Sequence, residues 1–453
     1  MKGNTVPLLI INGKIITWDM PNQILEGQAL LIQGDKISEM APQAELVSRY
    51  PHADQLDVHG QFVMPGNICA HTHFYGAFAR GMTIPGQAPK DFLEILQKLW
   101  WPLDRSLLAE DLRLSALVML ADAIRHGTTL LVDHHASPNY IAGSLDILAE
   151  AVEQAGMPAV LCYEVTDRDG QEKSQAGIKE NVRFLQLLQR APRPNVRAMF
   201  GMHASLTLSD ATLDACRQAA PSGSGFHLHV AESEADQYDS LLRCGMRVVD
   251  RLHRHGILGP NSLVAHAVHV DAHEINLLAD NGTWVSHQPR SNMNNAVGVA
   301  QVESMLRSGV PVCLGTDGFS STMWAEWKTA YLVQKLWNRD PRRMPADLLA
   351  DMAIYNNAAF AGRLFKDAPL GVIKPGAYAD LIAVDYHPYT PLTPENLPWH
   401  IVFGFHESMV TNTIVAGQIL MKDHQLLTLD EEEIAARGRE LAPSVWQRYQ
   451  QKQ

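Results

Sequence analysis

The stretch FVMPGNICAHTH (62–73) decides the fold, because a run of apolar residues there ends in two histidines, His71 and His73. Residues i and i+2 of an extended strand point to the same side, so the two imidazoles project together beyond the strand. Two imidazoles in this position form half of a metal site. The chain has 20 histidines and contains other such pairs, including His227 and His229. The first pair is therefore informative through its position at the end of an apolar strand.

Apolar runs of this kind recur along the middle of the chain and alternate with helical stretches such as 111–127 and 144–156. We expect eight strands, which are FVMPGNICA (62–70), TTLLVDH (128–134), PAVLCYEV (158–165), VRAMFGM (196–202), GFHLHV (225–230), SLVAHAV (262–268), TWVSH (283–287) and VPVCLGT (310–316). Because near-continuous apolar strands need cover on both faces, the pattern predicts an α/β fold with a closed (β/α)8 barrel of the TIM type. An open doubly wound sheet is the alternative fold, but its glycine-rich phosphate loop is missing.

Both ends of the chain are rich in strand-forming residues. The stretch LLIINGKIITW (8–18) predicts a hairpin that turns at its Asn-Gly pair, and ALLIQGDKISEM (29–40) and VTNTIVAGQILMKD (410–423) repeat the pattern. Short hairpins cannot form a core alone, so we expect them to combine into one small β-sandwich domain. The predicted organisation is a composite sandwich from residues 1–61 and 370–430, a catalytic barrel over 62–369 and a C-terminal helix over 431–453.

Every predicted barrel strand has an ionisable residue at or just beyond its carboxyl end, where barrels carry their active sites. These residues are His71 and His73, Asp133 with His134 and His135, Glu164, His203, His229 with Glu232, His266 with His269, His287, and Asp317. Three histidines and one carboxylate would make a metal site with a position left for water, which is the pattern of catalytic zinc sites. The residues proposed for it are His71, His73, His229 and Asp317. The alternative role for Asp317 is to cap the next helix.

Other residues near the strand ends have two interpretations each. Glu232 is either a proton shuttle to a substrate nitrogen or a solvated loop residue. His203 and His266 either serve the site or are hydrogen-bonded core histidines. His135 either contacts substrate or supports the site from behind. Trp101 either stacks on a flat heterocycle or packs against the first barrel helix.

Four motifs together resemble those of the amidohydrolase superfamily. They are PGNICAHTH (65–73), HLHVAE (227–232), VAHAVH (264–269) and GTDG (315–318), and they occur in the superfamily's order and separation. Within it the chain is similar, over nearly its whole length, to the cytosine-deaminase-like and guanine-deaminase-like aminohydrolases. The stretches KLWWPLDRSL (98–107), DHHASP (133–138), SNMNN (291–295) and HIVFG (400–404) further resemble the SsnA-type aminohydrolases.

The resemblance implies one divalent metal per subunit, Zn²⁺ or alternatively Fe²⁺. The implied ligands are His71, His73, His229 and Asp317. Binuclear members of the superfamily use a strand-four lysine that bridges two metals. The corresponding stretch VRAMFGMHAS (196–205) contains no lysine, which favours a single metal.

The resemblance also implies the reaction. Glu232 would protonate the ring nitrogen of the substrate, and His266 and Asp317 would orient and deprotonate the attacking water. His203 matches a position that contacts substrate. The implied activity is that of an aminohydrolase, which removes the amino group of a cyclic amidine in a small heterocycle of purine, pterin, pyrimidine or triazine type and releases ammonia.

Three alternatives remain open at this point. A chlorohydrolase or a cyclic amide or imide hydrolase would use the same scaffold, although some triazine chlorohydrolases lack the strand-eight aspartate that is present here as Asp317. A non-catalytic scaffold would have lost metal ligands that are all present. The stretch MHASLTLS (202–209) differs from the strand-four signature of guanine deaminases, which disfavours guanine as substrate.

Composition restricts the partners and the compartment. A formal net charge of −12, without basic clusters, argues against nucleic acid. The N-terminal apolar stretch is short and has no signal-peptide cleavage site, and no segment offers the roughly 20 apolar residues of a membrane helix. Five scattered cysteines without a CxxC pair predict a reduced, cytoplasmic protein. The relatives imply a homo-oligomer with a small-molecule substrate.

Overall fold

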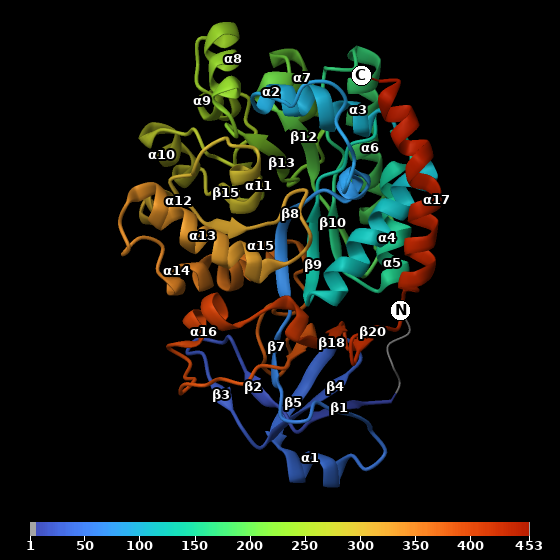
Figure 1. Cartoon of the computed structure of the whole chain (residues 1–453), viewed down its shortest axis with the longest axis vertical. Coiled ribbons are helices and arrows are strands. Elements are labelled where there is room, and N and C mark those ends of the chain that lie inside the picture. The colour runs from blue at the N-terminus through green and yellow to red at the C-terminus, as the bar shows by residue number, and fades with distance from the viewer. Residues whose placement is uncertain (1–5, 453) are drawn as a thin grey trace.

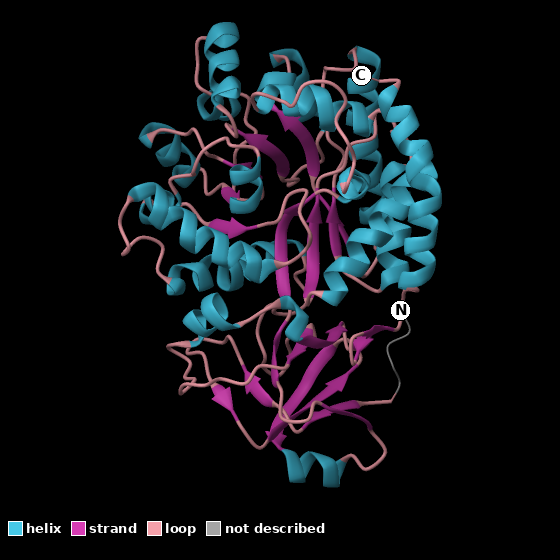
Figure 2. Ribbon diagram, in the orientation of Figure 1, coloured by secondary structure: helices cyan, strands magenta, loops and turns pink. Residues whose placement is uncertain are grey.

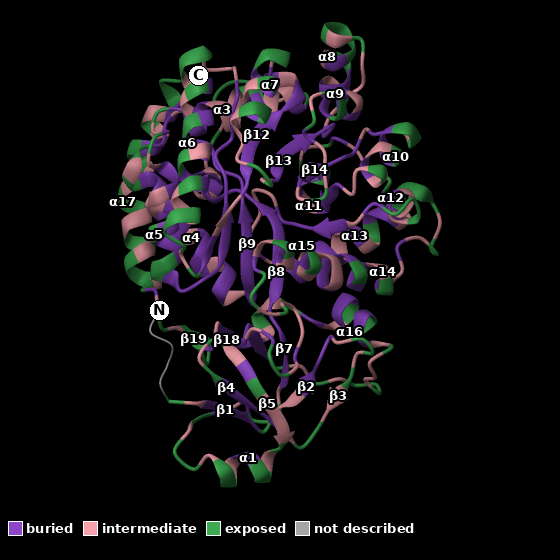
Figure 3. Ribbon diagram, turned by 180° about the vertical axis from the view of Figure 1, so that it is seen from behind, coloured by how far each residue is buried: buried purple, intermediate pink, exposed green. Residues whose placement is uncertain are grey.

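The computed structural model describes residues 6–452 and has two parts (Figure 1). Strands surrounded by helices form the upper part of the view, and a sandwich of strands from both ends of the chain lies below them (Figure 2). Buried positions concentrate on the strands of the upper part and on the layer between helices and strands (Figure 3). Among residues 6–452, no helix combines the length and the apolar character needed to cross a membrane.

The upper part is a closed parallel barrel. Its strands are β8 (Asn67–Thr72), β9 (Thr128–Asp133), β10 (Ala159–Leu161), β11 (Val196–Ala198), β12 (Phe200–Ala204), β13 (Phe226–Val230), β14 (Leu263–His266), β15 (Trp284–His287) and β16 (Val312–Leu314). They pair in the orders β11-β10-β9-β8 and β12-β13-β14-β15-β16. Parallel bridges from Val165 to Met202 and from Thr72 to Asp317 join the two sheets and close the ring. The predicted fourth strand (196–202) is divided at Met199 into β11 and β12, so the nine segments make eight barrel strands, and the predicted (β/α)8 fold is confirmed.

Helices cover the outside of the barrel, as the alternating sequence pattern requires. They are α4 (Ala109–Arg125), α5 (Ser144–Ala155), α6 (Gln171–Arg190), α7 (Asp210–Ala219), α8 (Glu234–Cys244), α9 (Val248–Arg254), α10 (Ala272–Asp280), α11 (Pro289–Asn294), α12 (Val302–Arg307), α13 (Met323–Asn338), α14 (Ala346–Ala350) and α15 (Asn357–Leu364). Local chemistry fixes their starts. At α10, for example, the Asp271 carboxylate accepts the Glu274 N–H while the Glu274 carboxylate accepts the Asp271 N–H.

The stretch 62–70, expected as one barrel strand, is divided at Gly66. Its first part, β7 (Phe62–Pro65), pairs with strands of the sandwich, and β8 begins the barrel. A Cβ atom on Gly66 would lie 2.1 Å from the Cγ2 of Thr129, so only glycine allows this close approach. The expectation of a single strand was wrong because apolar character does not reveal where a strand passes from one sheet to another.

The lower part is a sandwich of two sheets, which confirms the predicted fold of the terminal segments. One sheet has the order β5-β4-β1-β6, with β5 (Lys36–Pro42), β4 (Gln28–Gln33), β1 (Leu8–Ile11) and β6 (Asp54–Asp57). The other has the order β20-β19-β18-β17-β7-β2-β3, with β20 (Gln425–Leu426), β19 (Gln418–Lys422), β18 (Val410–Val415), β17 (Leu381–Val384), β2 (Lys14–Ile16) and β3 (Ile24–Leu25). Side chains such as Ile10, Leu30, Val63 and Leu381 form the core between the sheets. The helix α1 (Gln43–Arg49) covers the outer face of the first sheet through Leu46.

Two of the three predicted hairpins are present and one is not. The strands β4 and β5 pair antiparallel, as do β18 and β19. By contrast, β1 and β2 do not pair, because β1 lies between β4 and β6 and has no free edge. The Asn12-Gly13 corner instead carries the chain from one sheet to the other, with Asn12 at φ 57°.

The segment after β8 folds over the mouth of the barrel. It contains the 3₁₀ helix η1 (Phe74–Ala79), α2 (Phe92–Ile95), the π-helical turn η2 (Leu96–Trp100) and α3 (Trp101–Asp104). The C-terminal helix α17 (Glu431–Gln450) runs along α4 and reaches this segment (Figure 1). There the indole of Trp446 donates to the carbonyl of Phe78 at 3.0 Å, and the Tyr449 hydroxyl donates to the carbonyl of Lys98. The C-terminal helix thus holds the segment after β8 in place over the mouth of the barrel.

Candidate active site

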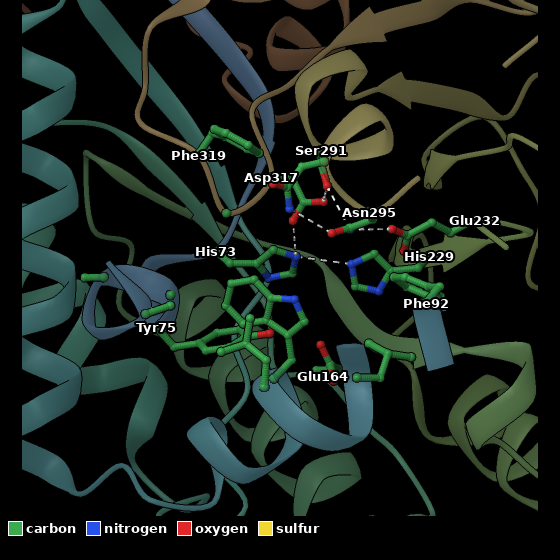
Figure 4. A pocket seen from close by; sticks show the side chains of 18 of the residues that line it. His73, Tyr75, Phe92, Glu164, His229, Glu232, Ser291, Asn295, Asp317 and Phe319 are labelled. Atoms are coloured by element: carbon green, nitrogen blue, oxygen red, sulfur yellow. Dashed lines mark hydrogen bonds and ion pairs between the residues drawn. The ribbon is translucent and has the colours of Figure 1, made fainter. Parts of the chain in front are cut away.

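A cavity of about 720 Å³ opens at the carboxyl ends of the barrel strands, beneath the segment that follows β8 (Figure 4). This is the face on which barrel enzymes carry their active sites. Seven residues that the sequence singled out line this cavity. They are His73, Trp101, Glu164, His203, His229, Glu232 and Asp317.

Three of the predicted metal ligands meet at one point of the cavity wall. The Nε2 of His73 lies 3.2 Å from Oδ1 of Asp317 and 3.2 Å from Nε2 of His229 (Figure 4). His71 stands beside them, with a ring nitrogen within 4.8 Å of ligand atoms of His73 and Asp317. The i, i+2 spacing on β8 therefore places both imidazoles as the sequence predicted.

The protonation of His73 and His229 suits a bound cation. Nδ1 of His73 lies 2.6 Å from the carbonyl of His134, and Nδ1 of His229 lies 3.0 Å from the carbonyl of His203. A carbonyl only accepts, so each Nδ1 carries a proton, and a metal bound between these side chains would face a lone pair at each Nε2. Two such lone pairs and a carboxylate oxygen at 3.2 Å repel one another unless a positive charge lies between them. The donor set thus fits a divalent metal of the zinc type.

Electrostatics of the ligands agree with this arrangement. Burial and the neighbouring imidazoles hold the pKa of His71 well below its usual value, so this ring is neutral. Burial also lowers the pKa of His229 well below its usual value. Although burial acts in the opposite direction, the Asp317 carboxylate raises the pKa of His73 to about 9, since it attracts positive charge to Nε2. A metal cation supplies that charge equally well.

His227, which the sequence left without a role, supports His71. Nδ1 of His71 lies 2.9 Å from Nε2 of His227, while Nε2 of His71 is buried and has no hydrogen-bond partner among the described residues. Nδ1 of His227 in turn lies 3.6 Å from Sγ of Cys162. With the His71 proton on Nδ1, its Nε2 is left free to bind a metal. The HxH spacing on β13 was visible in the sequence as a second pair on one strand face.

Glu232, His266 and Asp317 form a proton-handling group. Nε2 of His266 lies 3.4 Å from Oε2 of Glu232 and 3.6 Å from Oδ2 of Asp317. Burial raises the pKa of Glu232 to about 7, and the charge of Asp317 acts in the same direction. The Asp317 pKa stays below its usual range despite burial, because the carboxylate faces His73. One carboxylate thus remains charged while the other exchanges a proton near neutral pH.

The helix α11 and its C-cap Asn295 orient all three members of this group. The Ser291 hydroxyl donates to Oδ2 of Asp317 at 2.6 Å, and Oδ1 of Asn292 accepts from Nδ1 of His266 at 2.8 Å. The Asn295 amide donates to Oε1 of Glu232 at 3.3 Å (Figure 4). The motif SNMNN had marked this segment by resemblance, but no sequence pattern revealed these contacts.

The backbone at the barrel mouth is strained where the group sits. His266 has φ 73°, Asp317 has φ 56° and Ala231, beside Glu232, has φ 45°. L-residues rarely adopt this left-handed region, and such strain is concentrated at functional sites. The conformation aims the side chains inward at the point where each strand ends.

The predicted substrate contacts differ in their positions. His203 lines the cavity, and burial lowers its pKa to about 4, so the ring is neutral. Trp101 lines the cavity and packs against His203 with ring centroids 6.4 Å apart. His135 does not line the cavity, and its Nε2 faces the Ser137 hydroxyl at 2.9 Å behind the wall. Its expected contact with substrate is therefore replaced by a supporting position, the second of its two interpretations.

Aromatic and apolar side chains form much of the remaining cavity wall. Phe92, Trp100 and Phe319 line the cavity together with Trp101. Flat rings of this kind stack on a planar ligand and exclude water from it. The Trp100 ring itself sits close to the Cα of Gly318, where an ideal Cβ would lie 3.2 Å from the ring.

The fold, the cavity at the barrel mouth and the strand-end cluster together match the pattern of barrel enzymes, which carry their active sites at this face. A model described as "Amidohydrolase family" matches residues 62–420. The chain belongs to the amidohydrolase family, which is metal-dependent. The general resemblance inferred from the four motifs is confirmed.

Two relatives match nearly the whole chain. The chain is 34% identical over 446 residues to 5'-deoxyadenosine deaminase of Methanosarcina mazei, which covers 97% of this chain and 98% of the relative. It is 34% identical over 403 residues to 5-methylthioadenosine/S-adenosylhomocysteine deaminase of Haloarcula marismortui, which covers 87% and 89%. The crystal structure of an adenosine deaminase from Xanthomonas campestris with bound zinc superposes with a TM-score of 0.84 at 24% identity, covering 97% of this chain and 98% of that one.

Proposed function

We propose that this protein is a metal-dependent aminohydrolase that removes the amino group of a cyclic amidine in a small heterocycle and releases ammonia. The observation that carries the proposal is the meeting of His73, His229 and Asp317 at 3.2 Å, with an acid–base group beside it. The relatives that match almost the whole chain are deaminases of adenosine-type compounds, so an aminopurine nucleoside is the first substrate class to test.

We assign one divalent cation to this centre, with Zn²⁺ as the first choice and Fe²⁺ as the alternative. The proposed ligands are His71, His73, His229 and Asp317. Three imidazole nitrogens and one carboxylate are the ligand types that zinc binds in catalytic sites. Such a cation acidifies a water that it binds and so supplies a hydroxide nucleophile near neutral pH.

The chain's own residues move the protons. Asp317 stays ionised and accepts a proton from the attacking water, while the Ser291 hydroxyl fixes its orientation. Glu232, with a pKa of about 7, donates a proton to the ring nitrogen beside the reacting carbon. His266 lies between the two carboxylates and holds the water in line with them.

The balance of the reaction follows from these positions. Water adds its oxygen to the amidine carbon, and the ring nitrogen takes a proton from Glu232. The departing amino group then takes the proton that Asp317 received, and it leaves as ammonia. The ring keeps a carbonyl group, and Glu232 recovers its proton from the ring hydroxyl as the carbonyl forms.

The cavity fits a substrate of this class. Its volume of about 720 Å³ lies within the range of small-molecule sites and exceeds the space of a single base. The aromatic wall formed by Phe92, Trp100 and Trp101 suits a flat ring. The alternative is that the same residues catalyse the reaction of a chlorohydrolase or of a cyclic amide hydrolase. These reactions would give chloride or a ring-opened product in place of ammonia.

The experiment combines metal analysis with product analysis. Purified protein is loaded with Zn²⁺ or Fe²⁺ and incubated with amino-purine, pyrimidine, pterin and triazine compounds, while ammonia, chloride and ring opening are followed. We expect about one metal per chain and ammonia as the product, with both lost in His229→Ala. The exposed His253→Ala, from the HxH pair His253 and His255 outside the cavity, serves as the matched control and should keep both. Chloride release or ring opening without ammonia would contradict the proposal.

The compartment and the assembly are proposals of the same kind. Cys69, Cys162, Cys216 and Cys313 are buried free thiols, which suits a reducing compartment such as the cytoplasm. A homo-oligomer is expected from the family resemblance, and light scattering of the metal-loaded protein tests it.

A further inference from the structure

Glu164 follows β10 and faces the cavity from the side opposite to Asp317 (Figure 4). It lines the cavity, although its exposed fraction is only 3%. None of the proton-transfer steps above uses this carboxylate. A buried acidic group in a substrate cavity therefore needs a separate explanation.

The groups around Glu164 offset its negative charge, but they do not form hydrogen bonds to both of its carboxylate oxygens. Nη2 of Arg168 lies 3.7 Å from Oε1, and this guanidinium also pairs with Asp104. Nε2 of His203 lies 3.8 Å from Oε1. These positive and polar groups keep the carboxylate ionised, but they lie too far away to donate hydrogen bonds to it.

The second oxygen, Oε2, has no hydrogen-bond partner among the described residues. Nδ1 of His134 lies 3.3 Å from Oε2, in a geometry that is not that of a hydrogen bond. Nε2 of His134 lies 3.0 Å from the carbonyl of Met202 and therefore donates its proton there. A charged acceptor left without a donor in a buried site costs free energy unless a ligand supplies that donor.

Glu164 lies close to the proposed metal ligand His229. A carboxylate oxygen of Glu164 and ring nitrogens of His203 and His229 all lie within 4.8 Å of one another. A heterocycle whose amidine carbon is held beside His229 therefore brings another part of the same molecule to the carboxylate of Glu164.

We infer that Glu164 is a specificity-determining residue that accepts a hydrogen bond from an N–H or O–H group of the substrate, on the side away from the departing amine. The inference rests on the proposed aminohydrolase function and narrows its substrate class to amidines that carry such a donor. The donor has two sources, a ring N–H of a free base or a hydroxyl of an attached sugar.

The experiment uses pairs of compounds that differ in the donor alone. The pairs are cytosine and 1-methylcytosine, adenine and 9-methyladenine, and adenosine and 2',3'-dideoxyadenosine. We expect kcat/KM of the zinc-loaded wild type to favour the donor-bearing member of at least one pair by about 10- to 100-fold, as for a hydrogen bond to a charged acceptor. The pair that responds identifies the source.

Variants of Glu164 then test the residue. Glu164→Gln should abolish the preference, mainly through a higher KM for the donor-bearing member. Glu164→Asp keeps the charge beside Arg168 but withdraws it from the cavity, so it should act likewise if the first variant fails to fold. Glu180→Gln, a buried carboxylate outside the cavity that pairs with Arg183, is the matched control and should keep the preference.

Binding measurements separate this inference from the proposed function. Calorimetric titration of the same pairs into zinc-loaded Glu232→Gln measures recognition without turnover. Suppose that binding depends on the donor, that Glu164→Gln removes this dependence, and that the wild type releases no ammonia. This result would overturn the proposed function but leave the inference about Glu164 standing. Equal affinity for both members of every pair would overturn the inference. The inference would also be overturned if the wild type bound two metals per chain and Glu164→Gln bound only one, because Glu164 would then be a metal ligand.

Discussion

Replacing His227 tests whether the buried partner of His71 sets metal affinity. His227→Leu removes the acceptor that lies 2.9 Å from Nδ1 of His71 and leaves that N–H buried without a partner. Loss of a buried partner costs about 1–3 kcal/mol. Removal of a group that orients a metal-binding histidine weakens metal binding by about 10- to 100-fold, or roughly 1.4–2.8 kcal/mol. The two values agree, so we expect zinc to bind His227→Leu about 10- to 100-fold more weakly.

The matched variant His227→Gln keeps an acceptor oxygen at the position of Nε2 and should bind zinc within about threefold of the wild type. Zinc affinity is measured by competition with a chelating indicator on metal-free protein. The melting temperatures of the metal-free forms show whether each variant is folded. Equal zinc affinities of the Leu and Gln variants, both folded, would refute the reasoning, because the hydrogen bond would then have no part in metal binding.

Three further predictions concern the proton shuttle, a buried acid and the cover of the cavity. Glu232→Gln should lower kcat by about 10²–10⁴-fold with zinc affinity unchanged, and near-normal kcat would contradict the shuttle. Burial raises the pKa of Asp380 to about 7, above its unfolded value of about 4. The free energy of unfolding therefore falls as pH rises between these values. Asp380→Asn should raise the melting temperature at pH 8 but not at pH 4, with a gain in the free energy of unfolding of the order of 2–4 kcal/mol. An equal effect at both pH values would contradict this prediction. Trp446→Phe removes the N–H that is donated to the Phe78 carbonyl. Residues 74–107 should then exchange amide hydrogens faster, and kcat/KM should fall by up to about 10-fold. Unchanged exchange would contradict the view that the C-terminal helix holds these residues in place.

The barrel and the positions of the proposed metal ligands were predictable because they depend on local sequence. The residues His71, His73, His229 and Asp317 each stand at or just after an apolar run. In parallel strands the carboxyl ends meet at one face, so position in the chain is enough to bring them together. The distances of 3.2 Å from His73 to Asp317 and to His229 follow from the register of the strands.

The errors arose where the outcome depends on neighbours distant in sequence. A turn signal at Asn12-Gly13 shows that the chain changes direction, but not whether its flanking strands pair. Pairing failed there because β4 and β6 occupy both edges of β1. Likewise, the contact between Asn295 and Glu232 joins positions 63 residues apart. No periodicity indicates which side chain of a loop reaches across a cavity.

The two glutamates of the cavity show why a strand-end position does not define a role. Burial raises the pKa of Glu232 to about 7, and the nearby charge of Asp317 reinforces the shift. Burial acts on Glu164 in the same direction, yet His203, His134 and Arg168 bring its pKa down to about 2. One environment makes a carboxyl group that exchanges protons, and the other makes a permanent anion. The two carboxyl groups therefore differ because different side chains face them, and those side chains lie on other strands and loops.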